Sequence, residues 1–186
     1  EAAGGSGLGL LTRVLANITL ARADAGAALA LDRLGPALYV LQAFGGDGAV
    51  ARFAGPLLDD PGARAVLVLE DQVRSLTPGA AIAAAVASVP TDRADLVVGL
   101  GPVGAWVLEG PATVEAVRGA ALHAAGAGRI AFEGPAAAAW TDPAAAARAL
   151  ARVRIYHAAL IVGVLEDAAA FSREYAQGRV AFGQPI

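Results

Sequence analysis

Hydrophobic residues recur at helical spacing through the first sixty residues of the chain. Between residues 10 and 23 they return every three or four positions, which predicts a helix. Asp24 is placed to cap a second helix, and Pro36 suits the first turn of a third. A fourth helix would end at about Leu58, before the turn sequence at 59–62. The pattern therefore predicts a small helical bundle at the start of the chain.

The pattern then changes to short apolar runs separated by Gly, Pro and Asp. Such runs, rich in Val, Leu and Ile and interrupted by turn residues, are typical of strands. They occupy residues 65–69, 80–89, 95–100, 103–109 and 129–133. We therefore predict a compact β region in the middle of the chain.

A long helical pattern begins after Trp140. Thr141 or Asp142 can cap it, and Pro143 suits its first turn. Residues 144–177 would be about 50 Å long as a helix, so they form two helices or one long helix of a bundle. An apolar stripe predicts burial of this helix among partner helices. The stripe consists of Leu150, Val153, His157, Leu160, Val164 and Ala168.

Helices, strands and a helix follow one another without alternating, which predicts an α+β fold rather than repeated βαβ units. We divide the chain into an N-terminal helical bundle (1–62), a small middle β domain (63–138) and a long helix of a truncated C-terminal helical bundle (139–186). In this interpretation the first helices and most of the C-terminal bundle are missing.

Composition narrows the class of protein. Hydrophobic residues make up 56% of the 186 residues and the net charge is -3, which excludes disorder and argues against nucleic-acid binding. The absence of Cys excludes thiolate chemistry and fits a cytoplasmic protein. Each apolar run of about 18 residues contains a charge or a breaker, so we expect no membrane span. We also see no signal peptide. The mean hydropathy of +0.56 predicts an oligomer interface or further covering segments.

Several candidate chemistries have a simpler explanation. The glycines of 4–9 and 99–104 do not lie between a strand and a helix, so they are better explained as flexible or turn segments than as a dinucleotide site. His123 and His157 lack metal-binding spacing, and a hydrogen-bonded core histidine is the favoured explanation for His157. Glu166 and Asp167 diverge on a helix, so they indicate a solvated face.

The ends of the chain carry similarities to one family, in the family's order. The C-terminal helix is followed by Arg179, two variable residues and Phe182-Gly183, and residues 154–175 fit the preceding helix. Residues 22–26 fit a helix junction, and residues 124–134 fit the last part of a β domain. With these segments the chain resembles an incomplete and divergent acyl-CoA dehydrogenase.

The resemblance implies a reaction and a cofactor. Members of the family remove hydrogen from the α and β carbons of an acyl-CoA, with a carboxylate as base and FAD as hydride acceptor. By resemblance Arg179 and Phe182 would touch the FAD of a neighbouring subunit, and Ser75 would belong to a flavin-binding loop. The expected setting is fatty-acid degradation in the cytoplasm, in a homotetramer or a heteromer with a related subunit. An electron-transfer flavoprotein-like partner would accept the electrons.

Three departures from the family pattern leave alternatives open. The segment from Leu69 to Leu76 keeps Glu70 and Ser75 of the flavin loop but lacks its glycines. Residues 87–90 replace an aromatic segment over the flavin, and the β region is short. The base stays unassigned, because Val153 stands where some members carry it. A degenerate, non-catalytic or half-site subunit is therefore the alternative, and an unrelated helical interaction module is a third.

Overall fold

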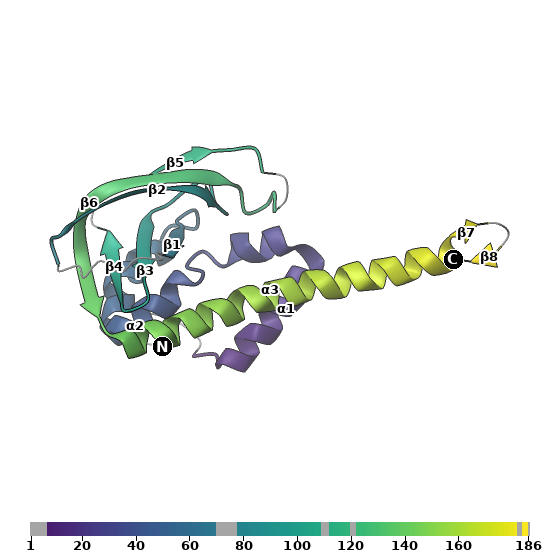
Figure 1. Cartoon of the computed structure of the whole chain (residues 1–186), viewed down its shortest axis with the longest axis horizontal. Helices are drawn as coiled ribbons and strands as arrows, with labels where there is room; N and C mark the ends of the chain where they lie inside the picture. Colours follow the sequence, from purple (N-terminus) through teal and green to yellow (C-terminus); the bar gives the residue numbers. More distant parts are fainter. Residues whose placement is uncertain (1–6, 70–77, 109–111, 120–121, 182–183, 186) are drawn as a thin grey trace.

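Helices at both ends enclose a β region, in the predicted α+β order (Figure 1). The computed structural model describes residues 7–69, 78–108, 112–119, 122–181 and 184–185. The N-terminal elements are α1 (Leu10–Leu31), α2 (Ala37–Ala49), a π-helical turn η1 (Val50–Ala54) and a 3-10 turn η2 (Gly55–Leu58). The strands are β1 (Ala65–Leu69), β2 (Ala81–Val89), β3 (Leu96–Leu100), β4 (Gly104–Leu108), β5 (Ala112–Ala116) and β6 (Gly128–Thr141). The chain continues in α3 (Pro143–Gly178) and the short strands β7 (Val180–Ala181) and β8 (Gln184–Pro185).

The predicted junction at Asp24 is a kink inside α1. Asp24 has extended backbone angles (φ -164°, ψ 112°), and its Oδ1 accepts from the N–H of Ala27 at 3.0 Å. This is the geometry of an N-cap, because the side chain satisfies a backbone donor that has no partner within the helix. The predicted cap is therefore confirmed, within a helix that runs on to Leu31.

The predicted end of the third helix is also visible as a local break. Gly46 lies inside α2 with φ +58° and ψ -154°, a conformation that glycine adopts without steric cost. The chain after this break forms the turns η1 and η2 rather than the regular fourth helix that we predicted. Pro56 in the second of these turns cannot donate a backbone hydrogen bond, which disfavours a regular α-helix there.

Strand β6 joins the strands into one curved sheet of order β1-β3-β4-β6-β2, with β5 also paired to β6. β1 and β3 are parallel, and the other pairs are antiparallel. The first part of β6 pairs with β2 and β5, and its last part pairs with β4 from Gly104 to Leu108. In Figure 1, β6 accordingly curves around one end of the β region.

Strands β5 and β6 correct the predicted β region. The run 129–133 is only the first part of β6, which continues through the alanine-rich tract to Thr141. Alanine favours helices in isolation, so pairing with β4 overrides local propensity here. We did not predict β5, whose alternating pattern is largely exposed at the edge of the sheet. Strands β1 to β4 agree with the predicted runs to within two residues at either end, and the short strands β7 and β8 were not predicted.

Two hydrophobic clusters lie on opposite faces of β3 and β4. Leu96, Val98 and Leu100 face α1, α2 and α3, whereas Val97 faces Ile130 and Phe132 of the opposing strands. All five residues of β3 are buried, as expected of a strand covered on both sides. Because α1, α2, β3, β4 and α3 share the first cluster, this core extends across all three predicted parts of the chain.

Helix α3 is a single helix of 36 residues, about 54 Å long at the usual rise. Asp142 caps it, because Oδ1 accepts from the N–H groups of Ala144 and Ala145 at 2.9 and 3.0 Å. The buried line runs through Val153, Tyr156, Leu160 and Gly163, so it is rotated from the stripe that we predicted. His157, Val164 and Ala168 of that stripe are exposed.

Helices α1 and α3 come into close backbone contact at Gly163. A Cβ atom at this position would lie 2.4 Å from the carbonyl oxygen of Ile18 and 2.8 Å from the nitrogen of Arg22. No side chain fits at such distances, so glycine is required for this backbone contact. The contact fixes α1 against the middle of α3.

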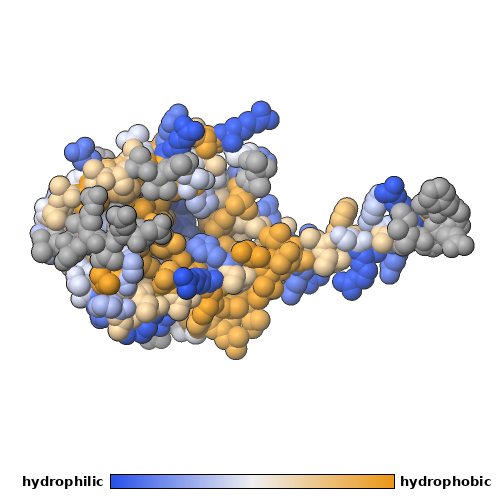
Figure 2. All heavy atoms as spheres, in the orientation of Figure 1, coloured by the Kyte–Doolittle hydropathy of each residue, from blue (hydrophilic) through white to orange (hydrophobic). Residues whose placement is uncertain are grey.

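Both long helices leave apolar side chains exposed on their outer faces. Figure 2 shows hydrophobic residues gathered where α1 and the middle of α3 lie. By length and composition alone, each helix contains a window of mean hydropathy 1.3 that could cross a bilayer. These windows are only 17% and 22% buried, so their outer faces lack cover among the described residues. The expected absence of a membrane span stays a prediction.

Candidate functional site

A cavity of about 130 Å³ lies where the end of α1, strand β1 and helix α3 meet. One wall is formed by Leu29, Asp32 and Arg33, and another by Tyr156 and His157. Four of the five residues of β1 and the turn at Pro90-Thr91 also line it. Cavities for drug-sized ligands span roughly 300–1,000 Å³, so this one accommodates part of a larger ligand.

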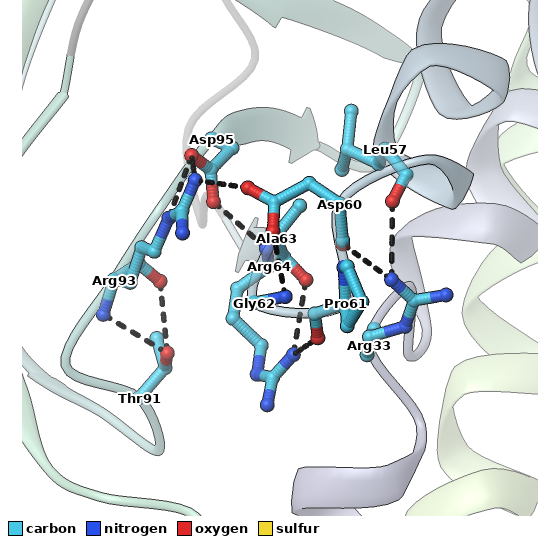
Figure 3. Close-up of polar contacts among 10 residues, drawn as sticks. All are labelled: Arg33, Leu57, Asp60, Pro61, Gly62, Ala63, Arg64, Thr91, Arg93 and Asp95. Carbon is cyan, nitrogen blue, oxygen red and sulfur yellow. Dashed lines mark hydrogen bonds and ion pairs between the residues drawn. The ribbon is translucent and has the colours of Figure 1, made fainter.

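Two arginines that line the cavity, Arg33 and Arg64, make hydrogen bonds to nearby backbone carbonyls (Figure 3). Arg33, which follows α1, donates through Nη1 to the carbonyl oxygens of Leu57 and Asp60. Arg64 donates through Nη1 to the carbonyl oxygens of Pro61 and Ala63 at 3.3 and 3.0 Å. The Arg33 bonds tie the turn before β1 to the end of α1, and the Arg64 bonds lie within that turn.

An exposed ion-pair cluster braces the same turn from the other side. Arg93 Nη2 lies 2.7 Å from both Asp60 Oδ2 and Asp95 Oδ1 (Figure 3). The N–H of Gly62 and the guanidinium of Arg93 hold the pKa of Asp60 below its usual value. The Thr91 hydroxyl donates to the carbonyl of Arg93 and accepts from its N–H, which fixes the Pro90-Thr91 turn at the cavity.

Tyr156 forms the buried part of the helical wall. Its side chain is 2% exposed, and its ring meets Tyr39 edge-on with centroids 6.3 Å apart. Burial raises the pKa of Tyr156, and the nearby carboxylate of Asp32 raises it further. Tyr156 therefore stays protonated and acts as a hydrogen-bond donor at neutral pH.

His157 lies next to Tyr156 at the rim of this cavity. The two rings are edge-on, with centroids 5.4 Å apart. Partial desolvation lowers the pKa of His157, and a hydrogen bond to the backbone of Val153 acts in the opposite direction. The expectation of a core histidine is wrong, because the actual buried line passes through the adjacent Tyr156 and leaves His157 exposed.

Arg179, the predicted FAD contact, lies at the opposite end of α3. Its Nη1 donates to the hydroxyl of Tyr175, and its guanidinium lies 5.4 Å from the centroid of that ring. Tyr175 in turn stacks on Phe171, with ring centroids 6.3 Å apart. The 23 residues from Tyr156 to Arg179 correspond to about 35 Å along the helix. Arg179 and the cavity of one chain are therefore well separated.

Solved structures match nearly the whole chain. Butyryl-CoA dehydrogenase from Megasphaera elsdenii is 21% identical with a TM-score of 0.64, over 98% of this chain and 57% of that one. FkbI, for biosynthesis of the methoxymalonyl extender unit of the polyketide Fk520, is 21% identical with a TM-score of 0.71, over 99% of this chain and 60% of that one. This chain has the acyl-CoA dehydrogenase fold.

Two further matches extend the comparison within the acyl-CoA dehydrogenase fold. A chain of the ChsE4-ChsE5 complex from Mycobacterium tuberculosis is 23% identical with a TM-score of 0.63, over 100% of this chain and 55% of that one. The FAD complex of PigA is 19% identical with a TM-score of 0.67, over 99% of this chain and 57% of that one. The sequence matches no protein-family model and no curated protein. The present chain thus spans somewhat more than half of each matched structure.

Two segments that we aligned with flavin-binding parts of acyl-CoA dehydrogenases meet at the cavity. Leu69, the first residue of the predicted flavin loop, lines it. Pro90, the last residue of the segment that replaces the aromatic one, lines it too. Glu70, Ser75 and Phe182 lie outside the described residues, so their roles stay predictions.

The sequence alone did not reveal this cavity. Its lining comes from the end of α1 with the turn that follows it, β1 with Arg64, the Pro90-Thr91 turn, Ala125 and α3. No spacing in the sequence joins segments that lie so far apart along the chain. The adjacent pair Tyr156-His157 was the available signal, because two polar aromatic residues directly precede the apolar run 158–165.

Proposed function

We propose that this chain is part of an acyl-CoA dehydrogenase-like flavoprotein, with the cavity taking part of the flavin or the acyl group. The observation that carries the proposal is the meeting of Leu69, the Pro90-Thr91 turn and α3 around one cavity. The FAD complex of PigA and butyryl-CoA dehydrogenase support the choice of ligands, since they share the fold.

The lining suits a flat ring or a short acyl chain. Leu29, Leu67 and Leu69 offer apolar contacts, and the Thr91 hydroxyl and two arginines supply polar groups at the edge. When bound, FAD would supply the hydride acceptor. Leu29 and Tyr156 from the helices and Leu67 from β1 would exclude water from the bound part.

Arg179 would contribute to a different copy of the site. It lies about 35 Å along α3 from the cavity of its own chain, so one side chain cannot serve both places. A contact with FAD of a neighbouring subunit would bring the positive charge to the pyrophosphate. Arg179 donates a hydrogen bond to Tyr175, whose ring stacks on Phe171. These contacts orient the guanidinium for such a role.

Flavin binding by the purified protein tests this proposal. We expect the visible absorbance of bound flavin, and turnover of short acyl-CoA thioesters with an artificial electron acceptor. Arg179→Gln should weaken FAD binding by about 10- to 100-fold, the loss expected for one hydrogen bond to a charged group. Arg173→Gln, on the same exposed part of α3, is the matched control. Unchanged FAD affinity in Arg179→Gln would refute the assigned contact.

The second candidate function is a degenerate subunit of a heteromeric acyl-CoA dehydrogenase. Val153 is 1% exposed and packed in the first hydrophobic cluster, so no proton acceptor stands at that position. The match to a chain of the ChsE4-ChsE5 complex supports a pairing of two related chains. In this case the isolated protein would lack turnover, and activity would appear only after co-expression with a related subunit.

A further inference from the structure

The cavity has a cationic end, where α1 and β1 meet. Arg33 follows α1, and Arg64 directly precedes β1. The carbonyl oxygen of Arg33 accepts from the N–H of Ala65 at 2.9 Å, so the two arginines lie on adjoining segments. Both arginines are half-buried and line the cavity. This end of the cavity therefore carries two positive charges.

The positive charge exceeds the negative charge of the lining. Among the described lining residues Asp32 is the one carboxylate, and its Oδ1 accepts from the N–H of Gly35 at 3.0 Å. Tyr156 and His157 add no charge at pH 7, because burial raises the pKa of the phenol and desolvation lowers the pKa of the imidazole. Two guanidinium groups against a single carboxylate favour an anionic ligand.

Both guanidinium groups keep hydrogen-bond donors for such a ligand. Arg33 and Arg64 donate to backbone carbonyls through Nη1 (Figure 3). Within the described part of the chain, no hydrogen bond uses their Nε or Nη2, and the ion pairs belong to Arg93. The edge formed by Nε and Nη2 can donate two parallel hydrogen bonds to a carboxylate or a phosphate.

The rest of the cavity is apolar and runs along β1. Leu67 and Leu69 line it from the strand, and Leu29 lines it from α1. Leu69 ends β1, about 16 Å from Arg64 by the usual rise of a strand. Leu69 is also the first residue of the segment that we aligned with the flavin loop. An aliphatic chain that ends in a carboxylate matches both ends of this cavity, whereas a phosphate would leave the leucines without an apolar partner.

We propose that the acyl group bound in this cavity carries a second carboxylate, so that the substrate class is the CoA thioesters of dicarboxylic acids. The proposal rests on the proposed function and names its substrate class. The thioester lies at the Leu69 end, and the distal carboxylate accepts hydrogen bonds from Arg33 and Arg64. The leucines contact the methylene groups between the two ends.

The same arrangement discriminates against an ordinary fatty acyl group. A monocarboxylic chain of equal length would place a methyl group against the two guanidinium groups. Their donors would then lose solvent without gaining an acceptor, which costs binding free energy. A site built to hydrogen-bond one group of its ligand rejects the analogue that lacks this group.

The affinities for a matched pair of thioesters test the assignment. Adipyl-CoA and hexanoyl-CoA both have six-carbon acyl chains, and they differ in a carboxylate against a methyl group at the far end. In calorimetric titration we expect adipyl-CoA to bind about 10-fold or more tightly than hexanoyl-CoA. Arg33→Gln or Arg64→Gln should weaken the binding of adipyl-CoA by about 10- to 100-fold and change that of hexanoyl-CoA by less than about 2-fold.

A purely structural role of these arginines would affect the two thioesters alike. Arg93→Gln is the control, since Arg93 braces the same turn and is not among the lining residues. Any effect of this variant should be equal for both thioesters. Equal affinity of the wild type for both, no binding of either, or parallel losses in Arg33→Gln and Arg64→Gln would overturn the assignment.

Flavin absorbance, measured on the same samples, separates this assignment from the proposed function. A protein that binds flavin and does not prefer adipyl-CoA would contradict the dicarboxylic substrate alone. A protein that prefers adipyl-CoA and does not bind flavin would contradict the proposed function and support the carboxylate site.

Discussion

The two halves of α3 have the same regular backbone but different means of support. The near half, residues 143–163, packs against α1, α2 and β4 and contributes all eight buried residues of the helix. The far half, residues 164–178, is largely exposed and carries contacts within the helix, such as the Phe171–Tyr175 stack and the bond from Ser172 to the carbonyl of Ala168. Packing against other elements of this chain thus stabilises the near half of α3 alone.

The two halves of α3 therefore have different roles. The near half builds the core and the wall of the cavity, whereas the far half extends away from the β region (Figure 1) and is followed by Arg179. Apolar side chains such as Ile161 and Leu165 remain 58% and 60% exposed around the point where one half passes into the other. They provide the apolar surface for the predicted oligomer interface.

Truncation of one leucine in each half gives the largest expected contrast. Leu160→Ala should lower the free energy of unfolding by about 2–5 kcal/mol, because it leaves a cavity in the first hydrophobic cluster. Leu165→Ala should change it by less than about 0.5 kcal/mol in the monomer, as exposed substitutions do. Urea unfolding followed by circular dichroism measures both. Equal losses would show that the far half is packed as tightly as the near half.

A pair of glycine substitutions tests the contact between α1 and α3. Gly163→Ala should destabilise by about 1–3 kcal/mol, because the added methyl group meets the backbone of Ile18 and Arg22. Gly178→Ala meets no neighbouring atom within 4 Å, so its helix propensity should make it neutral or stabilising by up to about 1 kcal/mol. Thermal unfolding of the two variants distinguishes the effects. A stabilised Gly163→Ala would mean that the helices do not pack here.

Loss of the N-cap is expected to give the smallest change. Asp142→Ala removes the acceptor for the N–H groups of Ala144 and Ala145, and should cost about 1 kcal/mol. Amide exchange should show the opening in the first turns of α3 but not in the far half. Asp167→Ala, an exposed substitution away from any cap, is the control. Uniformly faster exchange along α3 would show that the two halves unfold together.

Local signals in the sequence were sufficient for the caps and for the apolar strands. Asp24 and Asp142 cap helices as predicted, because a capping side chain satisfies a donor two or three residues away. β1 has the predicted bounds, since its five apolar residues lie between turn sequences. The order of elements was also correct, and the resemblance to acyl-CoA dehydrogenases is confirmed at the level of the fold.

The predictions from the sequence were wrong where contacts between residues far apart in the chain decide the structure. The alanine tract of β6 has helical propensity, and only pairing with β4 makes it a strand. The predicted buried face of α3 was rotated by about one residue. The helix packs through Gly163 and several alanines, whereas the prediction followed the larger apolar side chains. The cavity needed the tertiary structure, as its walls come from five separate segments. The predicted contacts of Arg179, Ser75 and Phe182 with FAD stay predictions.

Because α3 is unbroken, it fixes both the distance of Arg179 along the helix and the side of the helix on which Arg179 lies. Each residue turns an α-helix by about 100°, so a single insertion after Gly163 would swing Arg179 to another side of the helix. Seven inserted residues would restore nearly the same direction about 10 Å further away. An insertion or deletion between Gly163 and Arg179 therefore changes the distance and the direction of Arg179 together.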